Sequence, residues 1–228
     1  MDWVIAGARK AKEDTGIQVR LIASVNRHES LDLAEQVALL AAERRAAGII
    51  GMDLAGNEVK FSALPFTGIF REARQAGLHV TIHAGEWAGA QNVAEAILHL
   101  GAERIGHGVR VLEDERTVEI ARERGTIFEV CVTSNYQSGV VPVLADHPLA
   151  RMIAAGLNVT INTDDPSVSQ ITLGEEYRSV CEDLGLPIDA LKEHICIAAG
   201  SAFLPDGERA ILVETVKNAW STWEQEAL

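Results

Sequence analysis

The sequence predicts an α/β fold with a parallel sheet, most simply a (β/α)8 barrel that is incomplete in this chain. Short apolar segments alternate with helical segments, with a repeat of roughly 23–32 residues. Several helical segments end at a glycine just before the next apolar segment, as αβ loops commonly do. Polar residues follow several different strands, which favours a barrel over an open doubly wound sheet, and no G-x-G-x-x-G follows a strand.

The first element is expected to be a helix over residues 1–15, because its apolar residues recur at helical spacing and Gly16 can end it. The segment 19–25 is short and rich in β-branched residues, so it is expected to be a strand. Ser30 is a good N-cap for a long helix over residues 31–47, with a glycine directly after it.

The same alternation continues through the rest of the chain. Each remaining strand is a short, mostly apolar run, and most of the helical segments are closed by a glycine. The remaining strands are expected over residues 49–54, 78–82, 104–106, 126–132 and 157–164. The remaining helices are expected over residues 65–75, 92–100, 114–123 and 147–155, with mostly helical structure from about residue 173 onward.

Only six strands are predicted, whereas a complete barrel has eight strands and about 250 residues. The chain also starts directly in a helix, which is the natural partner of a strand that is missing. We therefore expect one domain over residues 1–228, a partial barrel that lacks its first two βα units. Because such a barrel has open sheet edges, self-association through these edges is expected.

The composition excludes several classes of protein. The net charge is −13 and no Lys/Arg cluster stands out, so nucleic acid is not an expected partner. No apolar run is long enough to span a membrane, and no secretion signal is seen, so no membrane partner is expected. The three cysteines are widely spaced and form no C-x-x-C pair, which indicates a reducing, cytoplasmic location.

Ionisable residues follow three of the predicted strands. His83 and Glu86 flank a tight Ala-Gly turn, His107 lies between two glycines, and Asp164 and Asp165 are adjacent. Each has an ordinary structural explanation: a hydrogen-bonded strand-end histidine, a tight turn, and an Asx turn or helix N-cap. Because the carboxyl ends of barrel strands meet at one face, the set as a whole predicts a hydrolytic metal site. Imidazole and carboxylate groups are ligands of zinc, which lowers the pKa of bound water to about 7.

Five ordered blocks of the sequence resemble adenosine deaminases, over a range from about residue 19 to about residue 204. The blocks are Asp53-Leu54-Ala55-Gly56-Asn57-Glu58, His83-Ala84-Gly85-Glu86, Arg104-Ile105-Gly106-His107-Gly108, Thr133-Ser134-Asn135 and Asn162-Thr163-Asp164-Asp165-Pro166. The resemblance implies a barrel of the metal-dependent hydrolase kind that deaminates adenosine or 2′-deoxyadenosine, with release of ammonia. The implied cofactor is one Zn²⁺ per chain, provided that all of its protein ligands are supplied. The implied partner is a small purine nucleoside.

The resemblance also implies a role for each matching residue. His83 and Asp164 would be zinc ligands, and Glu86 would protonate the purine ring nitrogen. His107 would orient the zinc-bound hydroxide and take part in proton transfer. Asp165 would hydrogen-bond the purine ring, and Gly56 would offer its backbone to the base. The H-x-E…P-C-x-x-C pattern of the cytidine-deaminase type of zinc site is absent from the sequence.

One part of the family pattern is missing. The remaining zinc ligands of adenosine deaminases are a His-x-His pair on the first strand, and this chain contains no His-x-His. With His83 and Asp164 alone, zinc would have too few protein ligands for a catalytic site. Three alternatives therefore stay open: an adenine or aminodeoxyfutalosine deaminase, a different amidohydrolase-type reaction, and a non-catalytic barrel fragment or interaction protein.

Overall fold

A computed structural model describes residues 1–226 and contains one parallel sheet of six strands. The strands lie side by side in chain order, and every neighbouring pair is parallel. The strands are β1 (Leu21–Asn26), β2 (Ile49–Ala55), β3 (His79–Ala84), β4 (Arg104–His107), β5 (Ile127–Val130) and β6 (Asn158–Ile161). Sequential parallel order with a helical connection after each strand is the arrangement of a (β/α) barrel wall.

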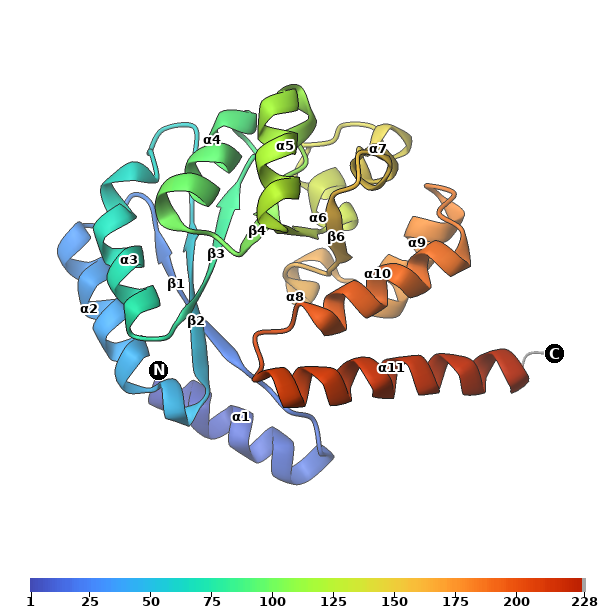
Figure 1. Ribbon diagram of the computed structural model, residues 1–228, viewed down its shortest axis with the longest axis horizontal. Helices are drawn as coiled ribbons and strands as arrows, with labels where there is room; N and C mark the ends of the chain where they lie inside the picture. Colours follow the sequence, from blue (N-terminus) through green and yellow to red (C-terminus); the bar gives the residue numbers. More distant parts are fainter. Residues whose placement is uncertain (227–228) are drawn as a thin grey trace.

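Helices cover the outer side of the curving sheet. Figure 1 shows α2, α3, α4 and α5 following the arc of the strands, whereas α11 extends away beneath α10. The α-helices are α1 (Asp2–Thr15), α2 (Leu31–Glu43), α3 (Thr67–Gln75), α4 (Ala90–Glu95), α5 (Glu115–Arg124), α6 (Val132–Gln137), α7 (Leu149–Ala154), α8 (Pro166–Ser169), α9 (Leu173–Glu182), α10 (Ile188–Gly200) and α11 (Asp206–Glu226). The shorter helical turns are Arg45–Ala47, Leu64–Phe66, Ala96–Leu100, Val111–Glu113 and Leu144–Asp146.

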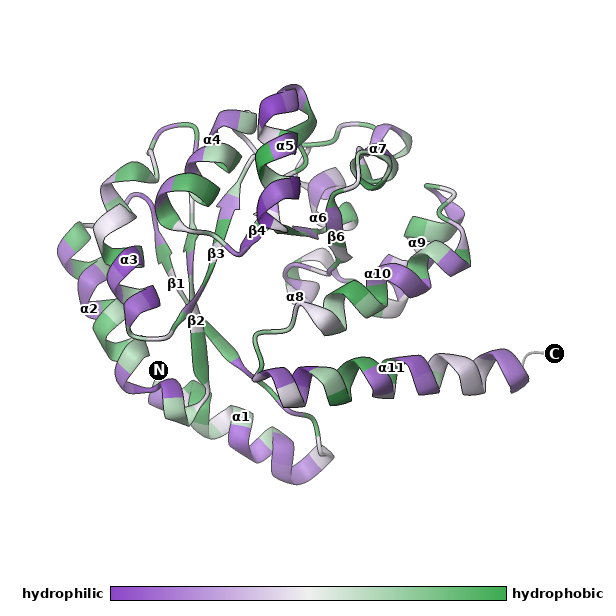
Figure 2. Ribbon diagram, in the orientation of Figure 1, coloured by the Kyte–Doolittle hydropathy of each residue, from purple (hydrophilic) through white to green (hydrophobic). Residues whose placement is uncertain are grey.

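The core lies between the sheet and these outer helices. Leu54, Ile82, Ile105 and Phe128 of the strands are fully buried, as is Phe70 of α3. Figure 2 shows the same division, with hydrophobic strands inside and hydrophilic helix faces outside. This core fixes the strands rigidly, so side chains at the strand ends have defined positions.

All six predicted strands are present, although the strand predicted over residues 157–164 ends at Ile161. The helix ends predicted at Gly16, Gly101 and Gly125 are confirmed. Gly16 ends α1 in the left-handed conformation, and Ser30 caps α2 by accepting a hydrogen bond from the backbone N–H of Leu33. The helix predicted over residues 31–47 is broken, because α2 ends at Glu43 and a separate short turn, Arg45–Ala47, follows. The helix predicted over residues 92–100 begins as α4 and finishes as a π-helical turn.

Two further predicted boundaries in the second half of the chain are wrong. The strand predicted over residues 126–132 ends at Val130, and α6 starts at once, with the carbonyl of Cys131 accepting from the N–H of Asn135. The helix predicted over residues 147–155 starts at Leu149. His147 is excluded from it because a residue that precedes proline is sterically pushed out of the helical conformation, and its ψ is 132°. Both shifts place polar side chains next to the strand ends.

The sheet is open within the described residues. β1 and β6 each pair with one neighbouring strand, so each leaves one edge without a strand partner in this part of the chain. Among residues 1–226, no helix is both long and apolar enough to cross a bilayer.

Candidate active site

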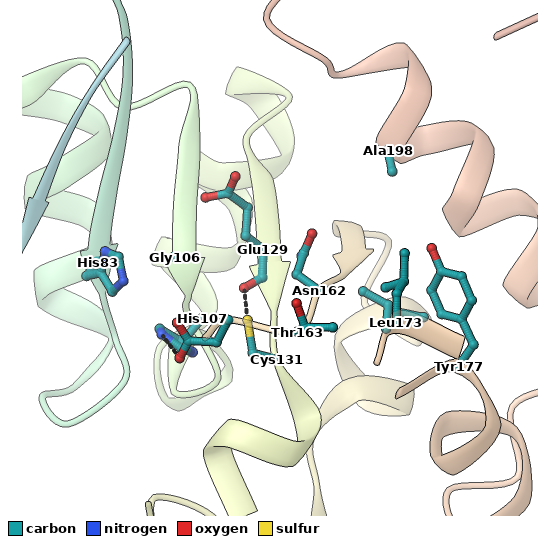
Figure 3. Close-up of a pocket in the computed structure, with 12 residues that line it drawn as sticks. His83, Gly106, His107, Glu129, Cys131, Asn162, Thr163, Leu173, Tyr177 and Ala198 are labelled. Atoms are coloured by element: carbon teal, nitrogen blue, oxygen red, sulfur yellow. Dashed lines mark hydrogen bonds and ion pairs between the residues drawn. The ribbon is translucent and has the colours of Figure 1, made fainter. Parts of the chain in front are cut away.

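The side chains of His83, His107, Glu86 and Asp164 meet at the carboxyl ends of β3, β4 and β6. The ring centroids of His83 and His107 are 5.3 Å apart. Nε2 of His107 lies 3.8 Å from Oε2 of Glu86 and 3.8 Å from Oδ2 of Asp164. His83, His107 and Asp164 line one cavity of about 420 Å³. The close-up in Figure 3 shows the two imidazoles on neighbouring strands at its wall.

Two of these residues have a backbone conformation that is rare for residues other than glycine. His107 has a φ of 62° and Asp164 a φ of 58°, both in the left-handed region. This conformation turns the chain sharply where each strand ends, so that the side chain is directed toward the neighbouring strand ends. Uncommon backbone geometry of this kind collects at functional sites, where the surrounding structure holds it in place.

Two glycines beside His83 and His107 are closely packed. A Cβ at Gly106 would lie 3.2 Å from the ring of His83, so this glycine leaves room for that ring. Gly108 has a φ of +62°, and a Cβ there would clash with Cδ1 of Phe128. A side chain at Gly108, in the loop after β4, would therefore need both a left-handed backbone and a shift of Phe128.

Gly108→Ala is expected to lower the free energy of unfolding by about 2–4 kcal/mol, the sum of left-handed strain and overpacking. Gly125→Ala is the matched control, because Gly125 has nearly the same φ of +63° and a Cβ at this position would have no neighbour within 4 Å. Denaturant unfolding of both variants separates the two contributions, since only the first includes the contact with Phe128. Equal losses in the free energy of unfolding of the two variants would show that the contact with Phe128 does not destabilise Gly108→Ala.

Asp53 of β2 orients His83. One carboxylate oxygen of Asp53 lies 2.9 Å from Nδ1 of His83, and the other accepts a hydrogen bond of 2.8 Å from the hydroxyl of Ser24. Burial lowers the pKa of His83, but the hydrogen bond and charge of Asp53, with the charges of Glu86 and Asp164, outweigh it and raise that pKa to about 9. A carboxylate on one ring nitrogen is the arrangement that fixes a metal-binding histidine, because it leaves the other nitrogen free.

The pKa values of Glu86 and His107 are both shifted in the direction that favours the neutral form. Burial raises the pKa of Glu86 from 4.5 to about 7, and the charge of His83 opposes this shift. Burial and the nearby charge of His83 lower the pKa of His107 to about 4. The site therefore holds a carboxyl group that can carry a proton at neutral pH beside an uncharged imidazole, which is a suitable pair for proton transfer.

Glu58 holds the loop that carries Glu86. Its carboxylate, which is 6% exposed, accepts hydrogen bonds from three successive backbone N–H groups, those of Gly85 (2.9 Å), Glu86 (2.7 Å) and Trp87 (2.6 Å). Arg27 binds the end of β3 just before this loop, because its guanidinium donates a hydrogen bond of 2.6 Å to the carbonyl of His83. Sequence reasoning assigned no role to Asp53, Glu58 or Arg27. The available signal was a charged residue inside or beside an apolar strand, which needs a partner when buried.

Gly56 and Asp165 lie at the margins of the site. Gly56 lines a second cavity of about 630 Å³ together with His83 and Glu86, so the two cavities meet at His83. Asp165 is the N-cap of α8, and its Oδ1 accepts from the N–H groups of Ser167 and Val168. Asp165 therefore has the structural role of a helix N-cap, whereas Asp164 lines the cavity.

The donor atoms of the site fit zinc in kind. The site offers imidazole nitrogen and carboxylate oxygen from His83 and Asp164, both of which line the same cavity. Donor atoms of His107, Cys131 and Asp164 also lie within 4.8 Å of one another. Cys131 was not expected from the sequence. Burial raises the pKa of its thiol well above the usual range, which disfavours the thiolate form that binds a metal.

Comparison with known proteins gives a consistent result. A model of the adenosine deaminase family matches residues 1–219. An adenosine deaminase from Edwardsiella ictaluri is 39% identical over 214 residues, which are 93% of this chain and 63% of that protein. An adenine deaminase structure from Arthrobacter aurescens is 32% identical with a TM-score of 0.88, over 96% of this chain and 66% of its own.

A second solved structure is an amidohydrolase from Burkholderia ambifaria with bound Zn. It is 27% identical and has a TM-score of 0.91, over 98% of this chain and 62% of its own. The chain thus spans a little under two thirds of the length of these proteins. The similarities confirm the predicted barrel-type α/β fold.

Proposed function

The chain belongs to the adenosine deaminase family, and we propose that it forms one domain over residues 1–228 of a zinc-dependent hydrolase that converts adenosine or 2′-deoxyadenosine to the corresponding inosine. The observation that carries this proposal is that Oε2 of Glu86 and Oδ2 of Asp164 each lie 3.8 Å from Nε2 of His107, where three strands end. A general acid, a neutral imidazole and a metal-binding carboxylate are the groups that hydrolytic deamination needs.

His83 and Asp164 are the residues proposed to hold zinc, which in such sites supplies a water of lowered pKa and stabilises developing negative charge. Glu86 carries a proton at neutral pH and delivers it to the purine ring nitrogen as water adds to the adjacent carbon. His107 orients that attacking water through Nε2. Gly56 offers its backbone to the base, and Asp165 offers the carboxylate oxygen that does not cap α8. Expulsion of the amino group as ammonia completes the exchange.

The test is a zinc assay combined with a deamination assay on the purified, zinc-supplemented chain. The proposal predicts zinc binding through His83, Asp164 and at least one further ligand, and conversion of adenosine to inosine, measured by the ultraviolet change of the purine and by ammonia release. Zinc below about a tenth of an equivalent together with unchanged adenosine would mean that this polypeptide is not itself the enzyme, because catalytic zinc sites need three protein ligands. That outcome favours the non-catalytic alternative.

Adenine is the second candidate substrate. The adenine deaminase from Arthrobacter aurescens shares the fold over 96% of this chain, which favours a purine base as well as a nucleoside. Parallel assays with adenosine, adenine and the aminodeoxyfutalosine nucleoside distinguish the candidates by kcat/KM. A chain that hydrolyses none of them but acts on another amide or amidine would support the other amidohydrolase-type reaction.

Asp53→Ala is expected to weaken zinc binding by about 10–100-fold, because His83 loses the carboxylate that orients its ring. Zinc titration by calorimetry or with a competing chelator measures this change. Ser24→Ala is the graded control: it removes one hydrogen bond from Asp53 and leaves the contact with His83 in place. An unchanged zinc affinity in Asp53→Ala would contradict the assignment of His83 as a ligand.

The open edges of the sheet are proposed to pair with a second copy of the chain. β1 and β6 each have a strand neighbour on one side, and Ile22 on β1 is 37% exposed. Light scattering is expected to give a mass above the 24.6 kDa of one chain, and Ile22→Lys is expected to shift it toward the monomer. Leu98→Lys, at an exposed apolar site away from the edges, should leave the mass unchanged. A monodisperse monomer of the unchanged chain would contradict the proposal.

We also propose a cytoplasmic location. Cys131, Cys181 and Cys196 are all free thiols, which suits a reducing compartment.

A further inference from the structure

A chain of hydrogen bonds runs from the backbone before α7 to the imidazole of His107. The backbone N–H of Leu149 donates to Nδ1 of His147 at 3.1 Å, and Nε2 of His147 lies 3.3 Å from Oδ1 of Asn135. Nδ2 of Asn135 in turn lies 3.1 Å from Nδ1 of His107. The three side-chain residues are 6%, 0% and 3% exposed, so water does not compete for these contacts.

The direction of this chain is fixed at its start. A backbone N–H can only donate, so Nδ1 of His147 is an acceptor and the ring proton of His147 resides on Nε2. That proton is donated to the amide oxygen of Asn135, which turns the amide nitrogen toward His107. Nδ1 of His107 is therefore also an acceptor, and its ring proton resides on Nε2. Burial lowers the pKa of His147 to about 4, which keeps this ring neutral and able to accept from Leu149.

We propose that Asn135 and His147 are positioning residues that hold His107 as the Nε2–H tautomer, so that this ring donates a hydrogen bond into the active-site cavity. The proton on Nε2 faces the two carboxylates of Glu86 and Asp164, each 3.8 Å away. In this tautomer the lone pair of His107 is occupied by Asn135 and is turned away from the cavity. His107 is thus a donor to an oxygen in the site rather than a metal ligand, although its ring is one of the three donor groups that lie within 4.8 Å of one another.

The local structure holds each member of the chain in place. α6 begins immediately after β5, which brings Asn135 beside the end of β4, and the backbone carbonyl of Asn135 also accepts from the N–H of Val141 at 2.9 Å. His147 lies outside α7, so its ring can fold back onto the N–H of Leu149 at the start of that helix. The left-handed backbone of His107 then directs its ring between Asn135 and the cavity. The orientation of the ring and the position of its proton are therefore set by the same contacts.

The tautomer can be measured directly by nuclear magnetic resonance, without turnover. In a chain labelled with ¹⁵N-histidine, long-range ¹H–¹⁵N correlation distinguishes a protonated ring nitrogen from an unprotonated one. The His107 signals are assigned by their loss in His107→Gln. The proposal expects an unprotonated Nδ1 and a protonated Nε2 for His107. A protonated Nδ1 in the unchanged chain would overturn it.

Two variants test whether Asn135 and His147 set this tautomer. Asn135→Asp replaces the donor by an acceptor, so Nδ1 of His107 is expected to become protonated. His147→Gln keeps a side-chain N–H that can reach Asn135, so the Nε2–H tautomer of His107 is expected to persist, whereas His147→Leu is expected to give a mixture. Unchanged His107 signals in both Asn135→Asp and His147→Leu would contradict the positioning role. His194→Leu is the matched control, because His194 is 5% exposed and, within residues 1–226, its side chain bonds to the carbonyl of Val159 and not to His107, so His107 should not respond.

The catalytic consequence of the proposal rests on the proposed deaminase function, and the two can fail separately. If the chain deaminates adenosine, Asn135→Asp is expected to lower kcat by about 10²-fold or more with little change in KM, because a wrong histidine tautomer removes a transition-state interaction. A correct tautomer pattern without turnover would leave the positioning role supported and count against the function alone. Turnover in a chain whose His107 carries its proton on Nδ1 would support the deaminase function and count against the positioning role.

Discussion

Glu86→Gln is expected to lower kcat for adenosine by about 10²–10⁴-fold, because it removes a general acid while keeping the shape of the side chain. Glu86 lies against Nε2 of His107 and lines the cavity that also contains His83 and Gly56. Glutamine cannot deliver a proton to the purine ring nitrogen. The measurement is steady-state deamination by the zinc-supplemented chain, with zinc content measured on the same samples.

The pH dependence gives an independent check on the same residue. Since burial raises the pKa of Glu86 to about 7, the acid form is present below that value and kcat/KM is expected to fall as pH rises above it. A carboxyl group whose pKa is raised in the folded state destabilises the fold as pH rises from 4.5 to 7. Glu86→Gln should therefore unfold at the same temperature as the unchanged chain, or higher, at pH 8.

The control for this variant is Glu123→Gln, a change of the same kind at an exposed position on α5. It should leave both kcat and the unfolding temperature unchanged. A Glu86→Gln variant that is folded, binds zinc and retains kcat within about tenfold of the unchanged chain would remove Glu86 from the role of general acid.

Glu58→Leu is expected to lower the free energy of unfolding by about 3–6 kcal/mol, a large fraction of the stability of a domain of this size. The reason is that the backbone N–H groups of Gly85, Glu86 and Trp87 all lose their acceptor, and Asn92 loses a further one. A buried donor left without a partner costs about 1–3 kcal/mol, more when its partner was charged. Urea unfolding monitored by circular dichroism measures the loss.

Glu58→Gln separates the hydrogen-bond loss from a loss of packing. Glutamine keeps one acceptor oxygen and the same volume, so a smaller loss of about 1–2 kcal/mol is expected. Glu123→Leu applies the same change at an exposed site and should alter stability by less than about 0.5 kcal/mol. If Glu58→Leu costs no more than Glu123→Leu, the loop after β3 is held by contacts other than this carboxylate.

The parts of the fold that could be predicted from the sequence are those that depend on local patterns. Short β-branched runs, helical spacing and stop glycines are properties of neighbouring residues, and they located all six strands. The meeting of His83, His107 and Asp164 was also predictable, because parallel strands in sequential order place their carboxyl ends side by side.

The rest depends on contacts between distant parts of the chain. Glu58 reaches Glu86 across 28 positions, and Asn135 reaches His107 across 28. No local pattern distinguishes a residue that will accept three backbone N–H groups from a solvated glutamate. Asn135 was placed at a strand end and lies in fact on α6, because one turn of helix satisfies the carbonyl of Cys131. The left-handed backbone of His107 is likewise not revealed by composition.

The central claim is that β3 and β6 together hold a metal ion while the imidazole on β4 acts as a donor. The most direct measurement is anomalous diffraction at the zinc edge from crystals of this chain grown with zinc. The expected result is one strong peak within coordination distance, about 2 Å, of Nε2 of His83 and a carboxylate oxygen of Asp164, with His107 outside that distance. A peak coordinated by His107 and Cys131, or the absence of any peak at His83, would contradict the account.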